Sequence, residues 1–218
     1  VKTSRFGIWI SMFITWVLTG CIVVFILLMP GFVGGVLGFS PFETTYFQMG
    51  GLVCIVSSCW LTGRLADKHN PSTLCILFSA GFAVSSVAFF SLLYTAAPVV
   101  SEVVLAYFAT CFFAGIMNFC PIFMCDVFPA RIRFSGISFA YNIAYALSGA
   151  FTPQLSFALH AYAKTHPDTL GAMGLSAYIV FLALVSIGTA LAMRRVYKNG
   201  GAAVSQMEFR PAPSALTT

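Results

Sequence analysis

The sequence predicts an all-α membrane protein with six transmembrane helices, and three observations lead to that fold class. The 218 residues are 59% hydrophobic and only 8% charged, whereas soluble domains carry about 25% charged residues. Ten of the eleven Lys and Arg residues lie before the first, after the last or in alternate gaps between long uncharged stretches. These six stretches are residues 6–42, 44–63, 71–101, 103–125, 134–159 and 169–193.

Each uncharged stretch has the length needed to cross a bilayer as a helix, which takes about 20 apolar residues. In lipid, backbone polar groups must bond within the protein, so spanning segments are helices or strands of a closed barrel. The stretches lack the alternation of barrel strands. We therefore expect helices at residues 9–29, 42–61, 71–94, 102–125, 135–159 and 172–193.

The positions of the basic residues predict how the chain is oriented. Cytoplasmic loops are enriched in Lys and Arg. Basic residues precede the first predicted helix and follow the second, fourth and sixth, and Lys164 is the exception. Both termini are therefore expected in the cytoplasm of a multi-pass plasma-membrane protein, which would be the inner membrane in a bacterium. The net charge of +5 reflects this topology, and no nucleic-acid partner is expected.

The boundaries of the first two helices follow from local signals. Pro30-Gly31 is expected to end the first helix, with the glycine-rich residues 31–38 forming an external loop or a broken helix end. The second helix opens at Ser40-Pro41-Phe42-Glu43, which has the form of a capping box with Pro at the first helical position.

The later helices have comparable signals. Asn70-Pro71 is expected to cap the third helix, and Glu102 is favourably placed at the N-terminus of the fourth. The tail at residues 198–218 is rich in Ala, Pro, Ser and Gly and is expected to be disordered.

Two short cytoplasmic loops combine acidic and basic residues. An acid flanked by cations can pair with neighbouring helix ends and hold one conformation of a moving bundle closed. The alternative is that the basic residues only anchor the topology. In the second loop, Asp126 and Arg133 bracket the turn and are candidates for a pair. The candidate gating residues are Gly63, Arg64, Asp67 and Lys68 in the first loop and Asp126, Pro129, Arg131 and Arg133 in the second.

Both loops resemble signatures of the major facilitator superfamily of secondary transporters. Gly63, Asp67 and Lys68 look like its Gly-x-x-x-Asp-Arg/Lys motif, with His69-Asn70-Pro71 in place of the usual Gly-Arg-Arg/Lys. The second loop resembles an acid-x-x-Pro-x-x-x-Arg motif. The run Phe-Pro-Ala-Arg-Ile-Arg-Phe-Ser-Gly-Ile-Ser-Phe-Ala-Tyr-Asn-Ile-Ala from Phe128, with Gly149-Ala150-Phe151-Thr152-Pro153, is similar to the metabolite:proton symporter family.

This resemblance implies a fold, a mechanism and a partner. Residues 5–197 would form helices seven to twelve of a twelve-helix carrier, that is, the C-terminal half of a major-facilitator-type bundle. Its family includes carriers of proline/betaine, 2-oxoglutarate, citrate and shikimate. We accordingly expect proton-coupled symport of a small organic acid or zwitterion by alternating access, with an N-terminal six-helix half as partner.

Polar side chains inside the predicted spans are candidates for a substrate pathway, because they are costly in lipid. Tyr107 and Asn118 share one face of the fourth helix. Asn118 and Asn142 lie at similar depths, so we expect that they can meet across a shared cavity; the alternative is that such residues only bond neighbouring helices. The candidates are Asn118, Asn142, Tyr145, Tyr141, Gln48 and Thr19.

The spans also limit the chemistry. No acid or base lies deep within any span, so the charged coupling and substrate residues are expected in another six-helix half. No Cys-x-x-Cys pair, metal-ligand cluster or nucleophile motif occurs, so we expect no metal, no cofactor and no enzymatic activity. Two alternatives remain: a complete six-span protein that homodimerises into a carrier or pore, and a regulatory or structural membrane partner without transport activity.

Overall fold

The computed structural model describes residues 2–95, 97–165 and 169–198. The described residues are helical apart from short connections, and no strand occurs among them. The tail predicted at residues 198–218 lies outside the described residues, except for Lys198. The elements are α1 (Lys2–Cys21), η1 (Ile22–Leu28), α2 (Met29–Leu37), α3 (Pro41–Ala66), α4 (Pro71–Leu93), α5 (Val100–Phe113), η2 (Ala114–Asn118), α6 (Phe119–Val127), α7 (Arg133–Thr165) and α8 (Thr169–Lys198).

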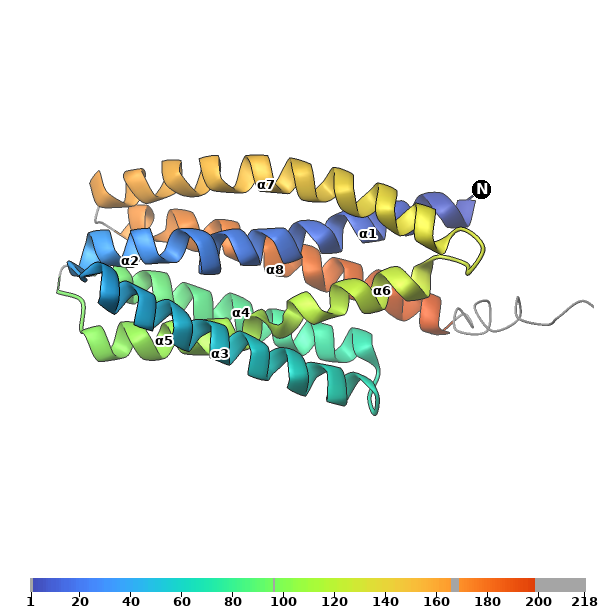
Figure 1. Ribbon diagram of the computed structural model, residues 1–218, viewed down its shortest axis with the longest axis horizontal. Coiled ribbons are helices and arrows are strands. Elements are labelled where there is room, and N and C mark those ends of the chain that lie inside the picture. Colours follow the sequence, from blue (N-terminus) through green and yellow to red (C-terminus); the bar gives the residue numbers. More distant parts are fainter. Residues whose placement is uncertain (1, 96, 166–168, 199–218) are drawn as a thin grey trace, which may run out of the picture.

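These elements form six long helices that run up and down one bundle (Figure 1). The elements α1, η1 and α2 join end to end, and so do α5, η2 and α6, so that a helix corresponds to each of the six predicted ranges. Among the described residues, five of the helices are long and apolar enough to cross a membrane. The sixth, α7, has the length, but its Ser, Tyr, Asn and Gln residues make it less apolar.

The connections that carry basic residues meet at one end of the bundle. The start of α1, the α3–α4 turn, the α6–α7 turn and the end of α8 lie together at the right of Figure 1. The other three connections lie at the left. We refer to the right-hand end as the basic end and to the left-hand end as the opposite end. The alternate spacing of basic residues along the sequence thus becomes a separation along the bundle axis, with Lys164 in the last turn of α7 as the exception.

The predicted end of the first helix at Pro30 is wrong. The chain remains helical to Leu37 and stops at Gly38, whose φ of 69° is left-handed and whose N–H donates to the Gly34 carbonyl at 3.1 Å. Proline is tolerated here because the π-helical η1 precedes it and Pro30 lies in the first turn of α2. A helix's first turn needs no N–H donor at that position.

The predicted helix starts at Ser40 and Asn70 are confirmed. The Ser40 backbone N–H donates to Glu43 Oε2 at 2.7 Å, and the Glu43 N–H donates to Ser40 Oγ at 3.4 Å, which completes the capping box. Asn70 Oδ1 accepts from the Ser72 N–H at 2.9 Å. Both caps satisfy backbone donors that have no partner inside the helix.

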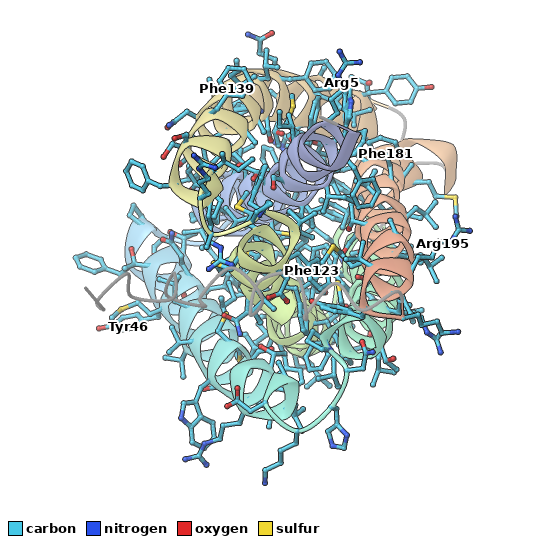
Figure 2. The ribbon with its side chains drawn as sticks, turned by 90° about the vertical axis from the view of Figure 1, so that its right-hand side faces the viewer. Arg5, Tyr46, Phe123, Phe139, Phe181 and Arg195 are labelled. Atoms are coloured by element: carbon cyan, nitrogen blue, oxygen red, sulfur yellow. The ribbon has the colours of Figure 1, made fainter. Side chains whose placement is uncertain are left out.

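Phenylalanine side chains fill the bundle interior. Towards the opposite end, Phe25 packs its ring against Phe82, Phe89 and Phe90, with centroids 5.5 to 6.4 Å away. At the basic end, α6 contributes more buried side chains than any other helix. Figure 2 looks onto this end and shows Phe123 at the centre of the bundle. α6 is therefore the central helix here, and α7 and α3 lie outside it.

Two helices are only lightly covered. α7 packs against α1 and α8 through a narrow stripe of small side chains at every fourth position: Ala140, Ala144, Ser148, Thr152 and Ser156. Most of its other side chains are half-buried or exposed, and Phe139 is 57% exposed. α3 exposes a row of large side chains along its length: Phe42, Tyr46, Met49, Val53, Val56 and Trp60. In Figure 2, Tyr46 and Phe139 both point away from the bundle on its left side.

Candidate functional site

Pro30 has no N–H to donate to the carbonyls one turn earlier in its helix. Side chains from two other helices donate to those carbonyls instead. In an α-helix the N–H of residue 30 would donate to the Ile26 carbonyl, and in a π-helix it would donate to the Phe25 carbonyl. Gln48 Nε2 donates to the Ile26 carbonyl at 2.6 Å. The Tyr107 hydroxyl donates to the Phe25 carbonyl at 3.0 Å. Gln48, a predicted pathway residue, therefore bonds the interrupted helix.

The Tyr107 side chain is held tightly in this position. It is 1% exposed, and its ring stacks on Phe47 with centroids 4.1 Å apart and an interplanar angle of 21°. Gly51 allows the ring to approach α3, since an added Cβ would lie 2.5 Å from Tyr107 Cε1. The hydrogen bonds to the interrupted helix thus depend on Phe47, Gln48 and Gly51 of α3 and on Tyr107 of α5.

Asn118 bonds a second interrupted helix to α3. It ends the 3₁₀ segment η2, and its Nδ2 donates to the Cys59 carbonyl at 3.2 Å and to Thr62 Oγ1 at 3.3 Å. The close approach of the two helices requires Gly115, because a Cβ there would lie 2.1 Å from Ser58 Oγ. Both interruptions, η1 and η2, are therefore bonded to the same helix, α3.

Thr19, another predicted pathway residue, is buried against its own helix. Its hydroxyl donates to the Thr15 carbonyl at 2.9 Å, and the residue is 1% exposed. Thr15 itself lies 3.8 Å from the Cys120 sulfur on α6. In this conformation Thr19 lies in the packing between helices and has no open surface.

Three predicted pathway residues lie on α7 near the edge of its covered stripe. The rings of Tyr141 and Tyr145 stack with centroids 5.6 Å apart. Tyr145 and Asn142 are exposed, and Asn142 Nδ2 donates only to the Ser138 carbonyl of its own helix, at 2.7 Å. Asn142 and Tyr145 thus face outward from the bundle, whereas Tyr141 is half-buried against the buried cluster at the basic end.

The structure does not bring Asn118 and Asn142 together, so the predicted meeting of the two amides is wrong. Asn118 points at α3, whereas Asn142 is exposed on α7. Helical periodicity relates residues on one helix to one another, but it contains no information on which neighbouring helix they meet.

The first gating loop contains no ion pair among its described residues. Asp67 ends α3, and its backbone N–H donates to the Gly63 carbonyl at 3.2 Å. The Arg64 guanidinium lies over the Trp60 ring, 4.0 Å from the centroid. Asp67 and Lys68 are both exposed. Gly63 borders the interruption at η2, since an added Cβ there would lie 3.4 Å from Asn118 Nδ2.

In the second gating loop, the predicted pair of Asp126 with Arg133 is wrong. Arg133 Nε donates to the Phe128 carbonyl at 3.2 Å. Asp126 Oδ2 accepts from the hydroxyl of Tyr197, near the end of α8, at 2.5 Å. Pro129 follows the end of α6, and Arg131 is exposed in the turn before α7. The acid of this loop is thus bonded to α8.

At the opposite end, His160 joins three helices. Its Nδ1 and the Tyr94 hydroxyl, just beyond α4, form a hydrogen bond of 2.5 Å. Its ring stacks on Phe32 of α2 with centroids 4.1 Å apart. Burial lowers the pKa of His160 to about 4, and the neighbouring positive charge of Lys164 adds to this effect.

No group of three or more His, Cys, Asp or Glu side chains among the described residues is arranged to hold a metal ion. The seven cysteines are free thiols, and only Cys125 is exposed.

Two tyrosines have roles that sequence reasoning missed. Tyr107 was placed on a helix face with Asn118 without a partner, and Tyr197 was not considered. Pro30 inside an uncharged stretch was a usable signal for Tyr107, because a helix that continues past proline needs donors from elsewhere. Nothing in the sequence indicates that Tyr197 reaches Asp126.

The described residues form a helical bundle with five helices long and apolar enough to cross a membrane, two interrupted helices and a cluster of basic residues at one end. No family model, no curated protein and no solved structure matches the chain.

Proposed function

We propose that the chain is a six-helix half of a secondary active transporter, embedded in the plasma membrane with its basic end in the cytoplasm. In this proposal α7 is the sixth membrane-spanning helix. A second six-helix bundle covers the faces of α3 and α7. The two bundles rock against each other, so that a site between them opens alternately to each side of the membrane.

The exposed polar surface of α7 is the observation that carries this proposal. Asn142, Tyr145 and Gln154 are exposed in the central part of this helix. Gln154 makes no hydrogen bond with any described residue, and Asn142 bonds only its own backbone. Polar side chains at membrane depth face protein or a water-filled cavity, because exposure to lipid is costly. A further bundle with an aqueous pathway satisfies that requirement.

The two helix interruptions supply a means of movement. Short π and 3₁₀ segments within long helices often occur at functional hinges. In this bundle side chains link the interrupted segments to other helices: Gln48 and Tyr107 donate to carbonyls of η1, and Asn118 of η2 donates to α3. Side-chain bonds can exchange partners as α3 moves, whereas an intact helical ladder cannot.

The substrate class follows from the resemblance and from the uncharged pathway surface. We propose a small organic acid or zwitterion, symported with a proton. The described helices have no Asp, Glu, Lys or Arg in their central parts. The groups that carry the proton and bind substrate charge therefore belong to the second bundle in this proposal.

Water accessibility at position 142 tests the pathway. In a Cys125→Ser background, Asn142→Cys in native membrane vesicles should react with a membrane-impermeant maleimide. The matched control is Leu184→Cys, which replaces a side chain 60% exposed on α8 and should remain unlabelled in lipid. Equal lack of reaction at both positions would contradict an aqueous pathway on α7.

Uptake into proteoliposomes tests transport itself. With the complementary bundle present, radiolabelled dicarboxylates or betaine should accumulate under an inward proton gradient, and Asn142→Ala should reduce uptake while Leu184→Ala should not. Uptake by this chain alone, as a dimer, would instead identify a homodimeric carrier. A second bundle that binds without uptake of any organic acid or zwitterion would identify a non-transporting membrane partner.

A further inference from the structure

We infer that a groove between α1 and α8 at the basic end binds an anionic phospholipid, with an acyl chain in the groove and the phosphate between Arg5 and Arg195. This inference goes beyond transport. It rests on the membrane location proposed above and not on carrier activity.

The groove has the shape and polarity of an acyl-chain site. It encloses about 370 Å³. The lining residues are spaced i, i+3, i+4 and i+7 on each helix, so one face of each helix forms one wall. Its only polar side chain, Thr189, donates its hydroxyl to the Ser186 carbonyl at 2.7 Å. The lining consists of Phe6, Trp9, Ile10 and Phe13 on α1 and Val185, Gly188, Thr189 and Ala192 on α8.

A contrast in side-chain size creates the groove. On α8, Gly188 has no heavy atom within 4 Å of the position that a Cβ would occupy, so the surface is open there. On α1, Trp9 and Phe13 are 59% and 44% exposed. Aromatic side chains of this kind are enriched near membrane interfaces. A flexible apolar chain can fill such a space without displacing any side chain of the bundle.

Two arginines stand at the mouth of the groove. Arg5 directly precedes Phe6, and Arg195 follows Ala192 by three positions, which continues the groove-lining face of α8 by about one turn. Both are exposed, and neither forms an ion pair with any described residue. In Figure 2, which looks onto the basic end, Arg5 lies at the upper right and Arg195 at the right.

Charge complementarity selects an anionic lipid as the occupant. In the proposed orientation both guanidinium groups lie at the depth of cytoplasmic headgroups. Arginine binds phosphate through paired hydrogen bonds, and each basic side chain near an anionic leaflet contributes about fivefold to binding. A neutral lipid would fill the groove but leave both cations without an added anion.

Fluorescence quenching tests the inference. A variant with Trp16→Phe and Trp60→Phe keeps Trp9 as its single tryptophan and is reconstituted with brominated phosphatidylglycerol or brominated phosphatidylcholine. We expect phosphatidylglycerol to quench Trp9 at a lower mole fraction. Adding Arg5→Gln and Arg195→Gln should lower the preference for phosphatidylglycerol over phosphatidylcholine about fivefold for each arginine removed. The matched control, Arg64→Gln with Arg131→Gln, removes the same charge at the same end and should keep the preference.

Blocking the groove gives an independent test. Gly188→Leu should abolish the preference although both arginines remain. Gly31→Leu, another glycine with open space around it, should not. Equal quenching by both lipids in the parent variant would overturn the inference. So would loss of the preference on adding soluble glycerol phosphate, or crosslinking of position 9 to a second copy in place of lipid quenching.

A flotation assay separates this inference from the proposed function. If the chain inserts into liposomes and prefers phosphatidylglycerol but supports no uptake, the lipid site is supported and the transport proposal is rejected. A chain that does not float with liposomes overturns both.

Discussion

The Tyr107 hydroxyl of α5 donates a hydrogen bond of 3.0 Å to the backbone carbonyl of Phe25, a residue of the π-helical segment η1. This bond and that from Gln48 to the Ile26 carbonyl occur at the two carbonyls that would otherwise bond the N–H of residue 30. A break in one helix is thus compensated by two others, and the first long helix crosses the whole bundle despite its proline.

Removing the Tyr107 hydroxyl should destabilise the bundle. Tyr107→Phe leaves the buried Phe25 carbonyl without its donor, which should lower the free energy of unfolding by about 1–2 kcal/mol. The measurement is unfolding of the purified chain in mixed maltoside and dodecyl sulfate micelles. Tyr46→Phe, at a tyrosine 73% exposed, should have no measurable effect.

A double-mutant cycle identifies the cause. Pro30→Ala restores an N–H at position 30, so the cost of Tyr107→Phe should be clearly smaller in that background. An unchanged cost would show that the hydroxyl stabilises the fold for a reason unrelated to the proline.

Enlarging Gly51 should be costly. A Cβ at this position would lie 2.5 Å from Tyr107 Cε1 and 2.6 Å from its hydroxyl oxygen, so the ring must move. Because the ring is packed on both sides, we expect Gly51→Ala to lower stability by about 1–3 kcal/mol. Gly149→Ala on α7, where nothing lies within 4 Å of the added Cβ, is the matched control. Similar stability of both variants would contradict the close packing of α3 on α5.

His160 should make stability depend on pH. Its pKa in the folded protein is lowered from 6.5 to about 4, chiefly by burial and then by Lys164. The unfolded chain therefore takes up the proton first, and stability falls as pH drops from about 6.5 towards 4 and is flat above that range. Thermal unfolding measured across this window should show the slope in the parent chain and lose it in His160→Gln.

His69→Gln is the control for that slope. His69 is exposed in the α3–α4 turn at the basic end, far along the bundle from the His160 contacts. The variant should retain the pH dependence of the parent. If His69→Gln abolished the pH dependence and His160→Gln kept it, the titrating group would be His69 and the prediction for His160 would be wrong.

Asp126 should be coupled energetically to Tyr197 and not to Arg133. The Asp126 carboxylate accepts from the Tyr197 hydroxyl at 2.5 Å, whereas Arg133 is bonded to the Phe128 carbonyl. A cycle of Asp126→Asn with Tyr197→Phe should give a coupling energy of about 0.5–1.5 kcal/mol. The parallel cycle of Asp126→Asn with Arg133→Gln should give none, and the reverse ranking would restore the pair expected from the loop motif.

Much of the architecture could be predicted because it depends on local chemistry. The uncharged stretches correspond to the long helices, and the caps at Ser40 and Asn70 follow from side chains that bond backbone N–H groups within three residues. The helix end at Pro30 could not be predicted from local rules. It depends on Gln48 and Tyr107, which come from other helices.

The candidate pathway was harder to predict than the helices. Sequence reasoning found polar residues within the spans, but not which of them face a neighbour. Asn118 and Thr19 are engaged in packing, whereas Asn142 and Tyr145 remain exposed. Helical periodicity fixes the face of a residue on its own helix, and the rotation of that helix in the bundle is decided by packing.

The sequence alone determined that this chain is helical, apolar and asymmetric in charge, because these properties come from composition and order along the chain. Only the tertiary structure decided that Asp126 bonds Tyr197, that α3 holds both interrupted helices and that α1 and α8 leave a groove beside Arg5 and Arg195. Such contacts join residues distant in sequence. Their partners depend on how six helices pack against one another, and no local pattern records that arrangement.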